Sequence, residues 1–332
     1  MKKSYFLLTS ILLTLFLQSC KMRSYTADSI VCDDIIKEIT PKNLLIGKNA
    51  DISIADSLVA ICDYHSVDSI VHLFNAKDYM YVKSFGKFGP GPKEILRPGQ
   101  LAYDRDKKEF YIFDYGQHHV VAFELDSIMS DRDYSPVVKH KFSTKTAFPD
   151  RYVHINDTLG YARSITPGKT RGFTQGIGKF NLSKFEMSPF GNPEEKCYEN
   201  RSLFSVSEQK GLLAEACSTQ DLLLIYNFDG DLVARIEGPE FSNESDRNHT
   251  FFSGVEFAGN LIMCPYSGDK TGKEFYGSNL VIFDGNGKYV KTLNLGKKIV
   301  DLTYNPVRES VIFVFDDEMQ IGEILIKDMI NA

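Results

Sequence analysis

Short hydrophobic runs recur along the chain at nearly constant spacing. They begin at residues 58, 110, 159, 212, 261 and 311, so a new run starts about every 50 residues. The runs read LVAIC, FYIFD, LGYAR, LLAEA, LIMCP and VIFVF. Segments in which apolar and polar residues alternate, such as DISIAD and IVDLTYN, precede most runs, and further apolar segments follow them. Because alternation with period two is typical of β-strands, the pattern predicts repeated units of four strands.

Six such units predict an all-β fold, a six-bladed β-propeller with four-stranded blades. A β-sandwich would not keep the repeat six times, and a parallel solenoid would need shorter rungs. The last unit holds only three predicted strands, which leaves one edge of its sheet unpaired. We expect the segment at residues 35–46, which contains IIKEIT and LLIG, to add the missing outer strand and close the ring.

The N-terminal segment differs in pattern from the repeats. Lys2 and Lys3 precede the apolar run YFLLTSILLTLFL, whose length as a helix is roughly 20 Å, short of the roughly 30 Å hydrocarbon core of a membrane. This pattern predicts a signal peptide rather than a membrane span. The tetrapeptide LQSC, which ends at Cys20, resembles a bacterial lipobox, and that resemblance implies cleavage before Cys20 and lipidation of its thiol.

The predicted organisation is therefore a lipoprotein signal peptide at residues 1–19, a lipidated tether at 20–34 and a six-bladed propeller at 35–332. Lys21 follows the cysteine, at the position where a lipoprotein retained in the inner membrane would carry aspartate. By analogy with lipoprotein sorting in Gram-negative bacteria, this favours the outer membrane. The sequence KMRS lacks the acidic cluster that exports some lipoproteins to the cell surface. We therefore expect the protein on the periplasmic face of the outer membrane.

The charge distribution excludes one class of partner. The 38 basic and 44 acidic residues are interspersed, and no basic stripe is present to meet nucleic-acid phosphates. The composition thus argues against a nucleic-acid partner.

The five cysteines after Cys20 are odd in number and form no Cys-x-x-Cys pair. We therefore expect most of them to be buried free thiols.

Residues 84–100, SFGKFGPGPKEILRPGQ, contain the densest group of glycines and prolines. A phosphate-binding loop needs consecutive backbone N–H groups at the start of a helix. Pro90 and Pro92 carry no N–H, and Pro98 leaves no room for a helix of useful length. The segment is better interpreted as the joint that carries the chain from the outermost strand of the first blade to the innermost strand of the second.

The same region resembles an NHL-type repeat. The matching elements are Phe85-Gly86, Gly89-Pro90-Gly91, Pro98, the LAYD and YIFD segments and HHVVAF. The whole chain is similar to TolB-like six-bladed propeller lipoproteins of Gram-negative anaerobes. That resemblance implies a propeller anchored in the cell envelope, and it implies no particular reaction.

No stretch of the sequence combines reactive side chains in a catalytic spacing. Gly-x-Ser-x-Gly, His-Glu-x-x-His and EF-hand patterns are absent, and GDKTGKE at 268–274 falls short of a Walker motif. Propeller geometry places two sets of connections on one face, which we call the loop face: those from the fourth strand to the next blade, and those from the second strand to the third. The predicted binding residues of the loop face are Asp63, His65, Lys87, Arg97, Asp114, His118, Arg163, Arg171, Tyr266 and Lys270.

We therefore expect a lipid-anchored, monomeric binding or scaffold module for an envelope protein or an envelope carbohydrate, without a cofactor. The alternative is a propeller hydrolase or lactonase with a divalent cation, such as calcium, on the axis. Three or four Asp, Glu, Asn or His side chains converging on one axial point would favour that alternative.

Overall fold

The computed structural model describes residues 23–26, 28–41, 46–47, 49–131, 134–144, 147–167, 173–191, 197, 202–270 and 275–332. The side chains of Arg23, Ser24, Pro167, Phe173 and Lys270 are not among the described parts. Cys20, the predicted signal peptide and Arg171 lie outside the described residues. No helix among the described residues has both the length and the apolar character needed to span a bilayer.

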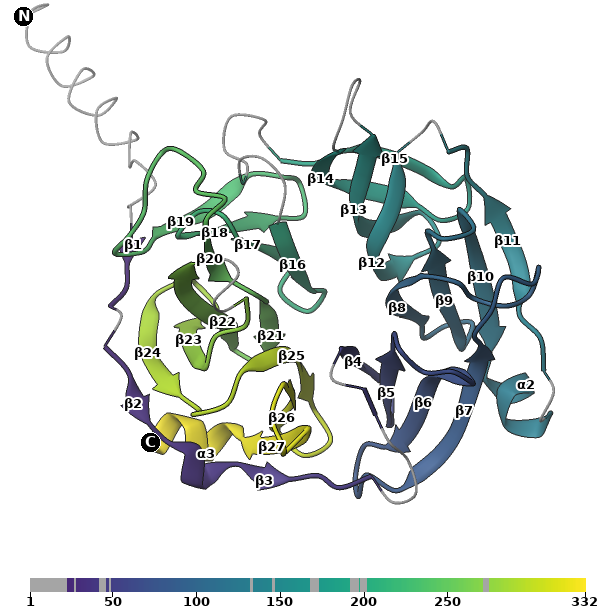
Figure 1. Ribbon diagram of the computed structural model, residues 1–332. Coiled ribbons are helices and arrows are strands. Elements are labelled where there is room, and N and C mark those ends of the chain that lie inside the picture. Colours follow the sequence, from purple (N-terminus) through teal and green to yellow (C-terminus); the bar gives the residue numbers. More distant parts are fainter. Residues whose placement is uncertain are drawn as a thin grey trace, which may run out of the picture.

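Six antiparallel sheets stand around a central axis as the blades of a propeller (Figure 1). Blade 1 consists of β4 (Ala50–Ala55), β5 (Leu58–Asp63), β6 (Ser69–Asn75) and β7 (Tyr81–Lys87). Blade 2 consists of β8 (Pro98–Asp104), β9 (Glu109–Asp114), β10 (His119–Glu124) and β11 (Val137–Lys141). Blade 3 consists of β12 (Phe148–Asn156), β13 (Leu159–Pro167), β14 (Phe173–Asn181) and β15 (Glu186–Pro189). The predicted all-β six-bladed fold is confirmed.

The remaining blades follow the same order from the axis outward. Blade 4 consists of β16 (Ser202–Ser207), β17 (Leu212–Cys217), β18 (Leu222–Asn227) and β19 (Leu232–Glu237). Blade 5 has two short inner strands, β20 (His249–Phe252) and β21 (Glu256–Ala258), followed by β22 (Leu261–Lys270), β23 (Asn279–Asp284) and β24 (Tyr289–Asn294). Blade 6 begins with β25 (Ile299–Asn305), β26 (Ser310–Phe315) and β27 (Ile321–Leu325).

The six recurring hydrophobic runs form the second strands of the six blades, β5, β9, β13, β17, β22 and β26. A second strand pairs on both edges and packs on both faces against neighbouring blades, so its side chains are buried on both sides. All six residues of β5 and all six of β26 are buried. This double burial explains why these strands give continuous apolar runs while the first strands alternate.

An N-terminal strand completes the last blade. β3 (Lys37–Glu38) pairs antiparallel with β27, in the register Gly322 to Glu38 and Glu323 to Lys37, and supplies the fourth strand that the C-terminal unit lacks. Its position lies within the predicted 35–46 segment, so the predicted closure is confirmed. The ring is thus held shut by residues from both ends of the chain.

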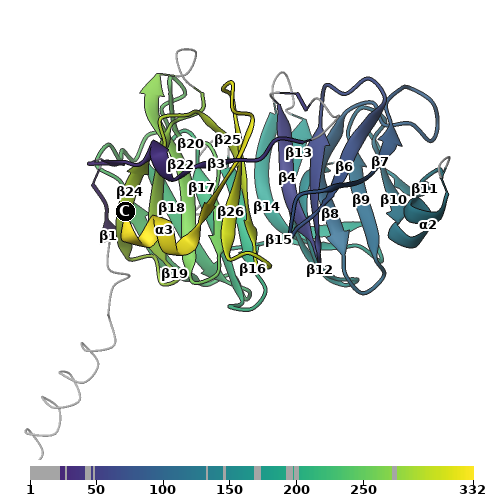
Figure 2. The ribbon, with the colours of Figure 1, turned by 90° about the horizontal axis from the view of Figure 1, so that it is seen from below.

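The chain before β3 adds strands that the hydrophobic pattern does not predict. β1 (Arg23–Ser24) pairs parallel with β19 as a fifth strand of blade 4, and β2 (Ile30–Val31) pairs parallel with β24 of blade 5. A 3-10 turn, η1 (Asp33–Ile35), separates β2 from β3. Figures 1 and 2 show this purple segment running along the outer edge of blades 4, 5 and 6. We call residues 23–38 the N-terminal strap.

Two short helices lie at the periphery. α2 (Leu125–Ser130) stands between the third and fourth strands of blade 2, and α3 (Ile326–Asn331) follows β27. The core consists of apolar side chains packed between adjacent blades. Phe85, Phe110 and Phe123 fill the space between blades 1 and 2, and the ring centroids of Phe85 and Phe123 lie 4.9 Å apart. Blade packing of this kind leaves the axis as the place where a cavity can persist.

The glycine-rich stretch at 84–100 is the joint that the sequence predicts. It leaves β7 and enters β8, the innermost strand of blade 2, and Gly86 adopts a φ of 78° at the bend. The N–H of Gly91 donates to Glu94 (3.0 Å), and the N–H of Gly89 donates to the Ile95 carbonyl (3.1 Å). These amides are therefore engaged within the joint, which agrees with the rejection of a phosphate loop.

Three of the five later cysteines, Cys32, Cys62 and Cys264, are buried free thiols, as expected for most of them. The other two, Cys197 and Cys217, form a disulfide with a Cα–Cα distance of 5.4 Å. Sequence spacing could not reveal this pair, because the two cysteines stand 20 residues apart and form no Cys-x-x-Cys motif.

Candidate functional site

Several predicted loop-face residues make internal contacts instead of pointing into open space. Asp114, at the end of β9, is fully buried and accepts the N–H groups of Leu96, Arg97 and Gly116, each at 2.9 Å. Burial alone would raise the pKa of Asp114, but the contact with His119 and these backbone donors hold it below its ordinary value. Asp114 therefore fastens the glycine-rich joint to blade 2.

Asp63 has a related position at the end of β5. It accepts the N–H of Gly47 (2.7 Å) and of His65 (2.9 Å). Gly47 belongs to the chain that enters β4, so this carboxylate also braces the entry of a blade. An aspartate after the second strand thus serves the fold in blades 1 and 2, a role that explains its burial without a ligand.

Arg163 and Tyr266 are likewise engaged inside the protein. The Arg163 guanidinium forms a two-pronged ion pair with Asp150, with Nε to Oδ1 at 3.0 Å, and donates to the Ser202 carbonyl at 2.9 Å. Tyr266 is buried and its hydroxyl donates to Asp221. Both side chains tie neighbouring blades together.

The other predicted residues are more exposed. His65 and Arg97 are exposed at the loop face, and Lys87 is also exposed and pairs with Glu94 at 3.1 Å. His118 is half-buried in the turn before β10, where its ring lies on Phe148. Lys270 ends β22. No residue of this group whose side chain is described lines the axial cavity that the first strands enclose, so their role at the loop face stays a prediction.

The axial cavity has a volume of about 430 Å³ and is walled by the first strands of all six blades. One end lies at the middle of these strands, where Arg151, Glu256 and Asp301 face the cavity. The other end opens among the turns between first and second strands, where Asp56, Arg105, Asp106 and Glu208 are exposed. We call this opening the turn-face mouth. It lies on the face of the ring opposite the predicted loop face.

Apolar side chains line the cavity between its two charged ends. Ile54, Val153, Ile155 and Val206 are half-buried wall residues, and Tyr103 and Tyr304 lie nearer the mouth. The side chains of an inner strand point alternately toward the two neighbouring blades, as Tyr152 and Val153 of β12 do, and those nearest the axis also border the cavity. The wall therefore offers apolar and aromatic surface with polar groups at the ends, as ligand sites of this size commonly do.

We give the name axial charge cluster to four charged residues at the inner end of the cavity: Arg151, Glu256 and Asp301, which line it, and Asp51, whose charge acts on Arg151 and Asp301. Each comes from an inner strand of a different blade. Asp301 accepts the N–H of Ile52 at 2.8 Å, which links blades 6 and 1 beside Asp51. Tyr64 donates a hydrogen bond to Asp51 from the loop after β5. Three carboxyl groups thus lie around a single arginine.

Two carboxyl groups of this cluster, those of Glu256 and Asp301, hold a proton more tightly than exposed carboxyl groups do. Burial, together with the charge of Asp51, raises the pKa of Asp301 well above its ordinary value. Burial opposes the charge of Arg151, but Asp51 and Asp301 outweigh that effect and raise the pKa of its guanidinium. Burial raises the pKa of Glu256 to about 7, although Ser205 (2.9 Å) donates to its carboxylate. The cluster therefore offers both hydrogen-bond donors and acceptors near neutral pH.

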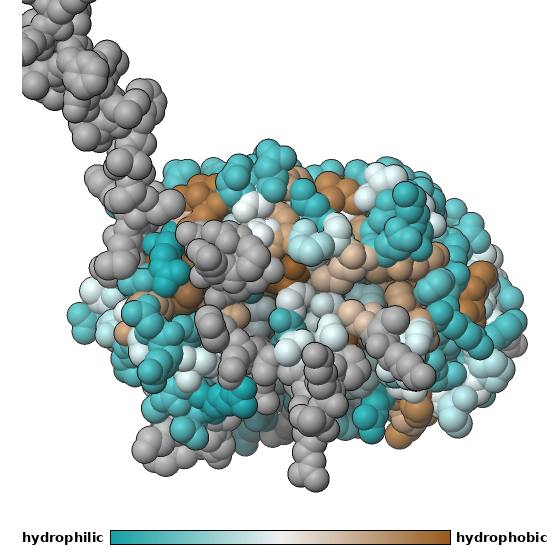
Figure 3. Space-filling view, turned by 90° about the horizontal axis from the view of Figure 1, so that it is seen from above, coloured by the Kyte–Doolittle hydropathy of each residue, from teal (hydrophilic) through white to brown (hydrophobic). Residues whose placement is uncertain are grey.

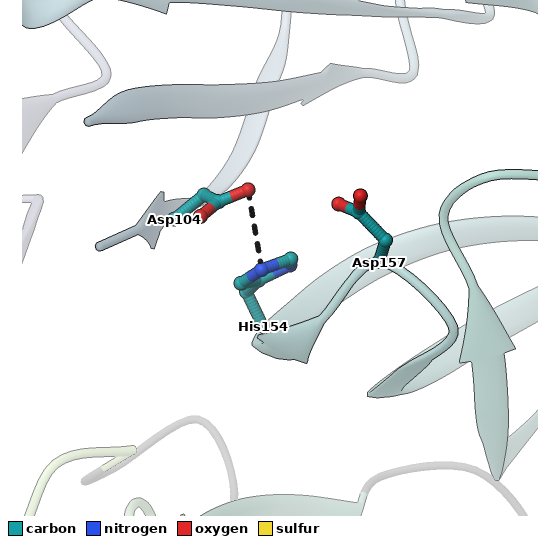
Figure 4. Close-up of side chains that lie close together, drawn as sticks. All are labelled: Asp104, His154 and Asp157. Carbon is teal, nitrogen blue, oxygen red and sulfur yellow. Dashed lines mark ion pairs between the residues drawn. The ribbon is translucent and has the colours of Figure 1, made fainter. Parts of the chain in front are cut away.

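A second polar group stands near the turn-face mouth, and we call it the rim cluster: Asp104, Lys107, His154 and Asp157. Figure 4 shows His154 between the two aspartates, with its Nε2 3.3 Å from Asp104 Oδ2. The Tyr152 hydroxyl lies 2.8 Å from Nδ1 of the same ring. Burial lowers the pKa of His154, so the ring is neutral at physiological pH despite the nearby carboxylates.

The rim cluster is the one group in the described part of the chain whose His, Cys, Asp or Glu side chains bring three potential metal ligands within 4.8 Å of one another. Its two carboxylates already have a cation, because the Lys107 ammonium contacts Asp157 and lies 3.6 Å from Asp104. These contacts join blades 2 and 3 across their turns. The cluster is therefore explained as an ion-pair network of the fold.

The axial carboxylates do not fit the divalent cation of the alternative function. Arg151 already serves as the counter-ion of Asp51 and Asp301, and a cation placed among them would meet a guanidinium. Within the described ranges the axial carboxylates do not form a group of three converging ligand atoms. Any chemistry at this end of the cavity would have to use its protons and hydrogen bonds.

Glu256 gives the cavity a testable pH signature. Its ordinary pKa is 4.5 and its folded value is about 7, so between these values the folded protein holds a proton that the unfolded chain has released. The free energy of unfolding should therefore fall as pH rises through this window, by on the order of 3 kcal/mol, and level off above it. In urea unfolding of Glu256→Gln this decline should be smaller by about that amount, and what is left of it comes from other buried carboxyl groups with a raised pKa, such as Asp301.

The exposed Glu186 on β15 supplies the matched control, since Glu186→Gln should keep the pH dependence of the unchanged protein. Equal pH dependence in Glu256→Gln and in the unchanged protein would contradict the assignment of the proton to Glu256.

Sequence inspection did not single out the axial charge cluster, although a signal was present. Asp51, Arg151, Glu256 and Asp301 all lie inside segments that the alternation assigns to first strands, DISIAD, RYVHIND, SGVEFAG and IVDLTYN. First strands line the axis of a propeller, so charged residues within them are candidates for an axial site. Their convergence follows only from closing the ring.

Comparison with known proteins agrees with this architecture. The family model described as "TolB-like 6-blade propeller-like" matches residues 34–306. A Bacteroides fragilis protein described as exported is 13% identical, with a TM-score of 0.59, and the match covers 91% of this chain and 98% of that one. A comparison with curated protein sequences found no match.

Two enzymes with solved structures share the fold at lower identity. A gluconolactonase of Xanthomonas campestris is 8% identical with a TM-score of 0.54, and the match covers 83% of this chain and 84% of that one. A streptogramin B lyase is also 8% identical, with a TM-score of 0.55 and coverage of 87% and 96%. At these identities the likeness concerns the fold alone.

Proposed function

Because this chain belongs to the TolB-like six-bladed propeller family, we propose that it is a binding module of the cell envelope whose axial cavity takes up a carbohydrate. The family fold alone does not select a ligand. The observation that carries the proposal is the axial cavity, with the axial charge cluster at its inner end and an open mouth at the turn face.

The cavity matches the chemistry of a sugar better than that of a flat protein surface. Its volume of about 430 Å³ is in the range of small-molecule sites. Sugar hydroxyl groups both donate and accept hydrogen bonds, and the cluster offers carboxylate acceptors beside a guanidinium donor. The wall residues Tyr103 and Tyr304 add aromatic surface for the apolar faces of sugar rings. A protein partner would engage the narrow cavity only through a protruding segment.

A second candidate function has a specific observation in its favour. Glu256, with a pKa of about 7, can exchange a proton at neutral pH, and burial beside the charge of Asp51 raises the pKa of Asp301 well above its ordinary value. The cavity could therefore hydrolyse or eliminate a bound sugar derivative by acid–base chemistry. The lactonase and lyase with the same fold agree with this candidate without supporting a particular reaction.

The proposed location is the cell envelope, with a lipid on Cys20 and attachment to the periplasmic face of the outer membrane. The basic start, the apolar run and LQSC support export and anchorage. The Cys197–Cys217 disulfide supports an oxidising compartment, because such bonds are rare in the cytosol. Replacement of Cys20 by alanine should release the protein from the membrane fraction, and an unchanged membrane fraction would contradict the anchor.

Binding to fragments of envelope polysaccharides tests the proposed function. The mature chain should bind at least one fragment in isothermal titration calorimetry, and Glu256→Gln should weaken that affinity by at least about tenfold. Glu186→Gln, on the outer strand β15, is the matched control and should bind normally. Equal affinity of all three proteins would contradict the axial site, and conversion of the fragment would establish the enzymatic candidate instead.

A further inference from the structure

The N-terminal strap begins beside a tightly fixed side chain. Tyr25 is only 4% exposed, although it stands five positions after the predicted lipidated residue Cys20. Its ring packs against Phe252, Tyr266 and Phe283, with edge-to-face geometry and centroid distances of 5.8 Å to Tyr266 and 5.7 Å to Phe283. Its hydroxyl donates to the fully buried carboxylate of Asp221. The start of the described chain is therefore locked between blades 4 and 5.

The direction in which the chain arrives is also fixed. β1 is parallel to β19, with Arg23 beside Ile236 and Ser24 beside Glu237, the last residue of that strand. Fourth strands run from the turn face to the loop face, so the chain climbs the outer edge of blade 4 in the same sense. Cys32 continues the attachment farther along, where its N–H donates to the Asn294 carbonyl at 3.0 Å.

Chain length limits how far the membrane can be from this edge. Arg23 is the third residue after Cys20, and an extended chain over that interval reaches about 11 Å at most. Ile236, the partner of Arg23, stands four residues from the turn-face end of β19, a rise of about 13 Å along the strand. A membrane lying flat against the turn face would therefore require the interval from Cys20 to Arg23 to be fully extended down the edge of blade 4, whereas a membrane beside that edge would require no such extension.

Taken together, these contacts lead us to propose that the outer edge of blade 4 faces the lipid surface, so that the propeller lies side-on and its turn-face mouth stays clear of the membrane. The partner is the lipid surface itself, and the inference rests on the lipid anchor of the proposed function. Figure 3, which looks onto the edge formed by blades 3 and 4, shows hydrophobic areas separated by hydrophilic ones where grey atoms do not cover it. The anchor and the strap, rather than an apolar belt, would then set the orientation.

The consequence for function is direct. In a side-on propeller the axis of the ring runs parallel to the membrane, so the axial cavity opens to ligands that move along the membrane surface. Were the mouth pressed against the bilayer, only lipid-borne ligands could enter. The locked strap thus keeps the outer edge of blade 4 close to the lipid anchor, because only three residues separate Arg23 from Cys20.

The absence of tryptophan from the sequence allows single reporters to be introduced. Three valines with similar exposure stand at informative places: Val233 on β19 of blade 4 (45%), Val137 on β11 of blade 2 (53%) and Val307 in the first turn of blade 6 (49%). Each would be replaced by tryptophan in the chain from residue 20 onward. A synthetic lipid coupled to the Cys20 thiol would attach each variant to phospholipid vesicles that carry a nitroxide on the headgroup.

We expect several-fold greater quenching of tryptophan fluorescence in Val233→Trp than in Val137→Trp or Val307→Trp. Strongest quenching in Val307→Trp would mean that the turn face meets the membrane, and equal quenching at all three positions would mean free tumbling. Either result would overturn the proposal. Because the lipid is coupled chemically, these outcomes are independent of whether cells lipidate Cys20, which the Cys20→Ala fractionation tests.

Tyr25 provides a second variant. With Tyr25→Ala in the Val233→Trp chain, the lock is removed, and quenching of the introduced tryptophan should fall toward that measured at the other two positions. Unchanged quenching would show that the buried tyrosine does not orient the propeller, and would overturn the role of the strap.

Discussion

Replacement of Asp114 by alanine is expected to lower the free energy of unfolding by about 3–5 kcal/mol, because it removes the buried acceptor of three backbone donors and the partner of the buried His119. The amides of Leu96, Arg97 and Gly116 all donate to this fully buried carboxylate at 2.9 Å. These donors belong to the joint between blades 1 and 2 and to the turn beside it. Equilibrium unfolding in urea, followed by far-ultraviolet circular dichroism, would measure the loss.

Asp126 on α2 is the matched control, since its side chain is 74% exposed. Asp126→Ala should change the stability by no more than about 0.5 kcal/mol. The folded pKa of Asp114 is depressed below 3.8, so its contribution is present above that value and is lost as pH falls through the folded pKa. A loss of less than about 1 kcal/mol in Asp114→Ala would contradict its role as the fastening of the joint.

Truncation of Tyr25 to alanine should have a comparable effect, a loss of about 3–5 kcal/mol, although this residue precedes the first blade in sequence. The ring fills a pocket between blades 4 and 5 and contacts Phe252, Tyr266 and Phe283. Its removal leaves a cavity and takes one donor from the buried Asp221. Burial raises the pKa of Asp221, and loss of a hydrogen bond to its carboxylate should raise it further. Calorimetric or denaturant unfolding measures the change.

Tyr25→Phe separates packing from hydrogen bonding. It keeps the ring contacts and should cost about 1–2 kcal/mol. Tyr115→Ala, at an exposed tyrosine of the loop after β9, should be close to neutral. If Tyr25→Ala were as mild as Tyr115→Ala, the strap would be only loosely attached, against the burial of Tyr25.

The hydrophobic pattern predicted the fold well because the strongest signals come from strands buried on both faces. All six second strands coincide with the recurring runs, and the joint at residues 84–100 and the closing strand β3 lie where the pattern places them. The two-residue strands β1 and β2 were missed. Their pairing depends on Tyr25 and Cys32 finding pockets in blades 4 and 5, contacts that no local periodicity encodes.

The sequence predicted less of the candidate site than of the fold. Loop-face residues such as Asp63 and Asp114 have the polar character of a binding site, but in the structure they brace the chain where it enters a blade. Arg151, Glu256 and Asp301 lie far apart in the sequence, because each comes from a different blade. Only ring closure brings them to one axis, so their convergence required the structure.

The proposed binding function depends on where a ligand lies. A crystal structure of the mature protein with a bound envelope saccharide would answer this most directly. The account predicts sugar density in the axial cavity, with hydroxyl groups within hydrogen-bond distance of Arg151 and Glu256. Sugar density at the loop face beside Lys87 and Arg97, with the axial cavity free of ligand, would contradict it.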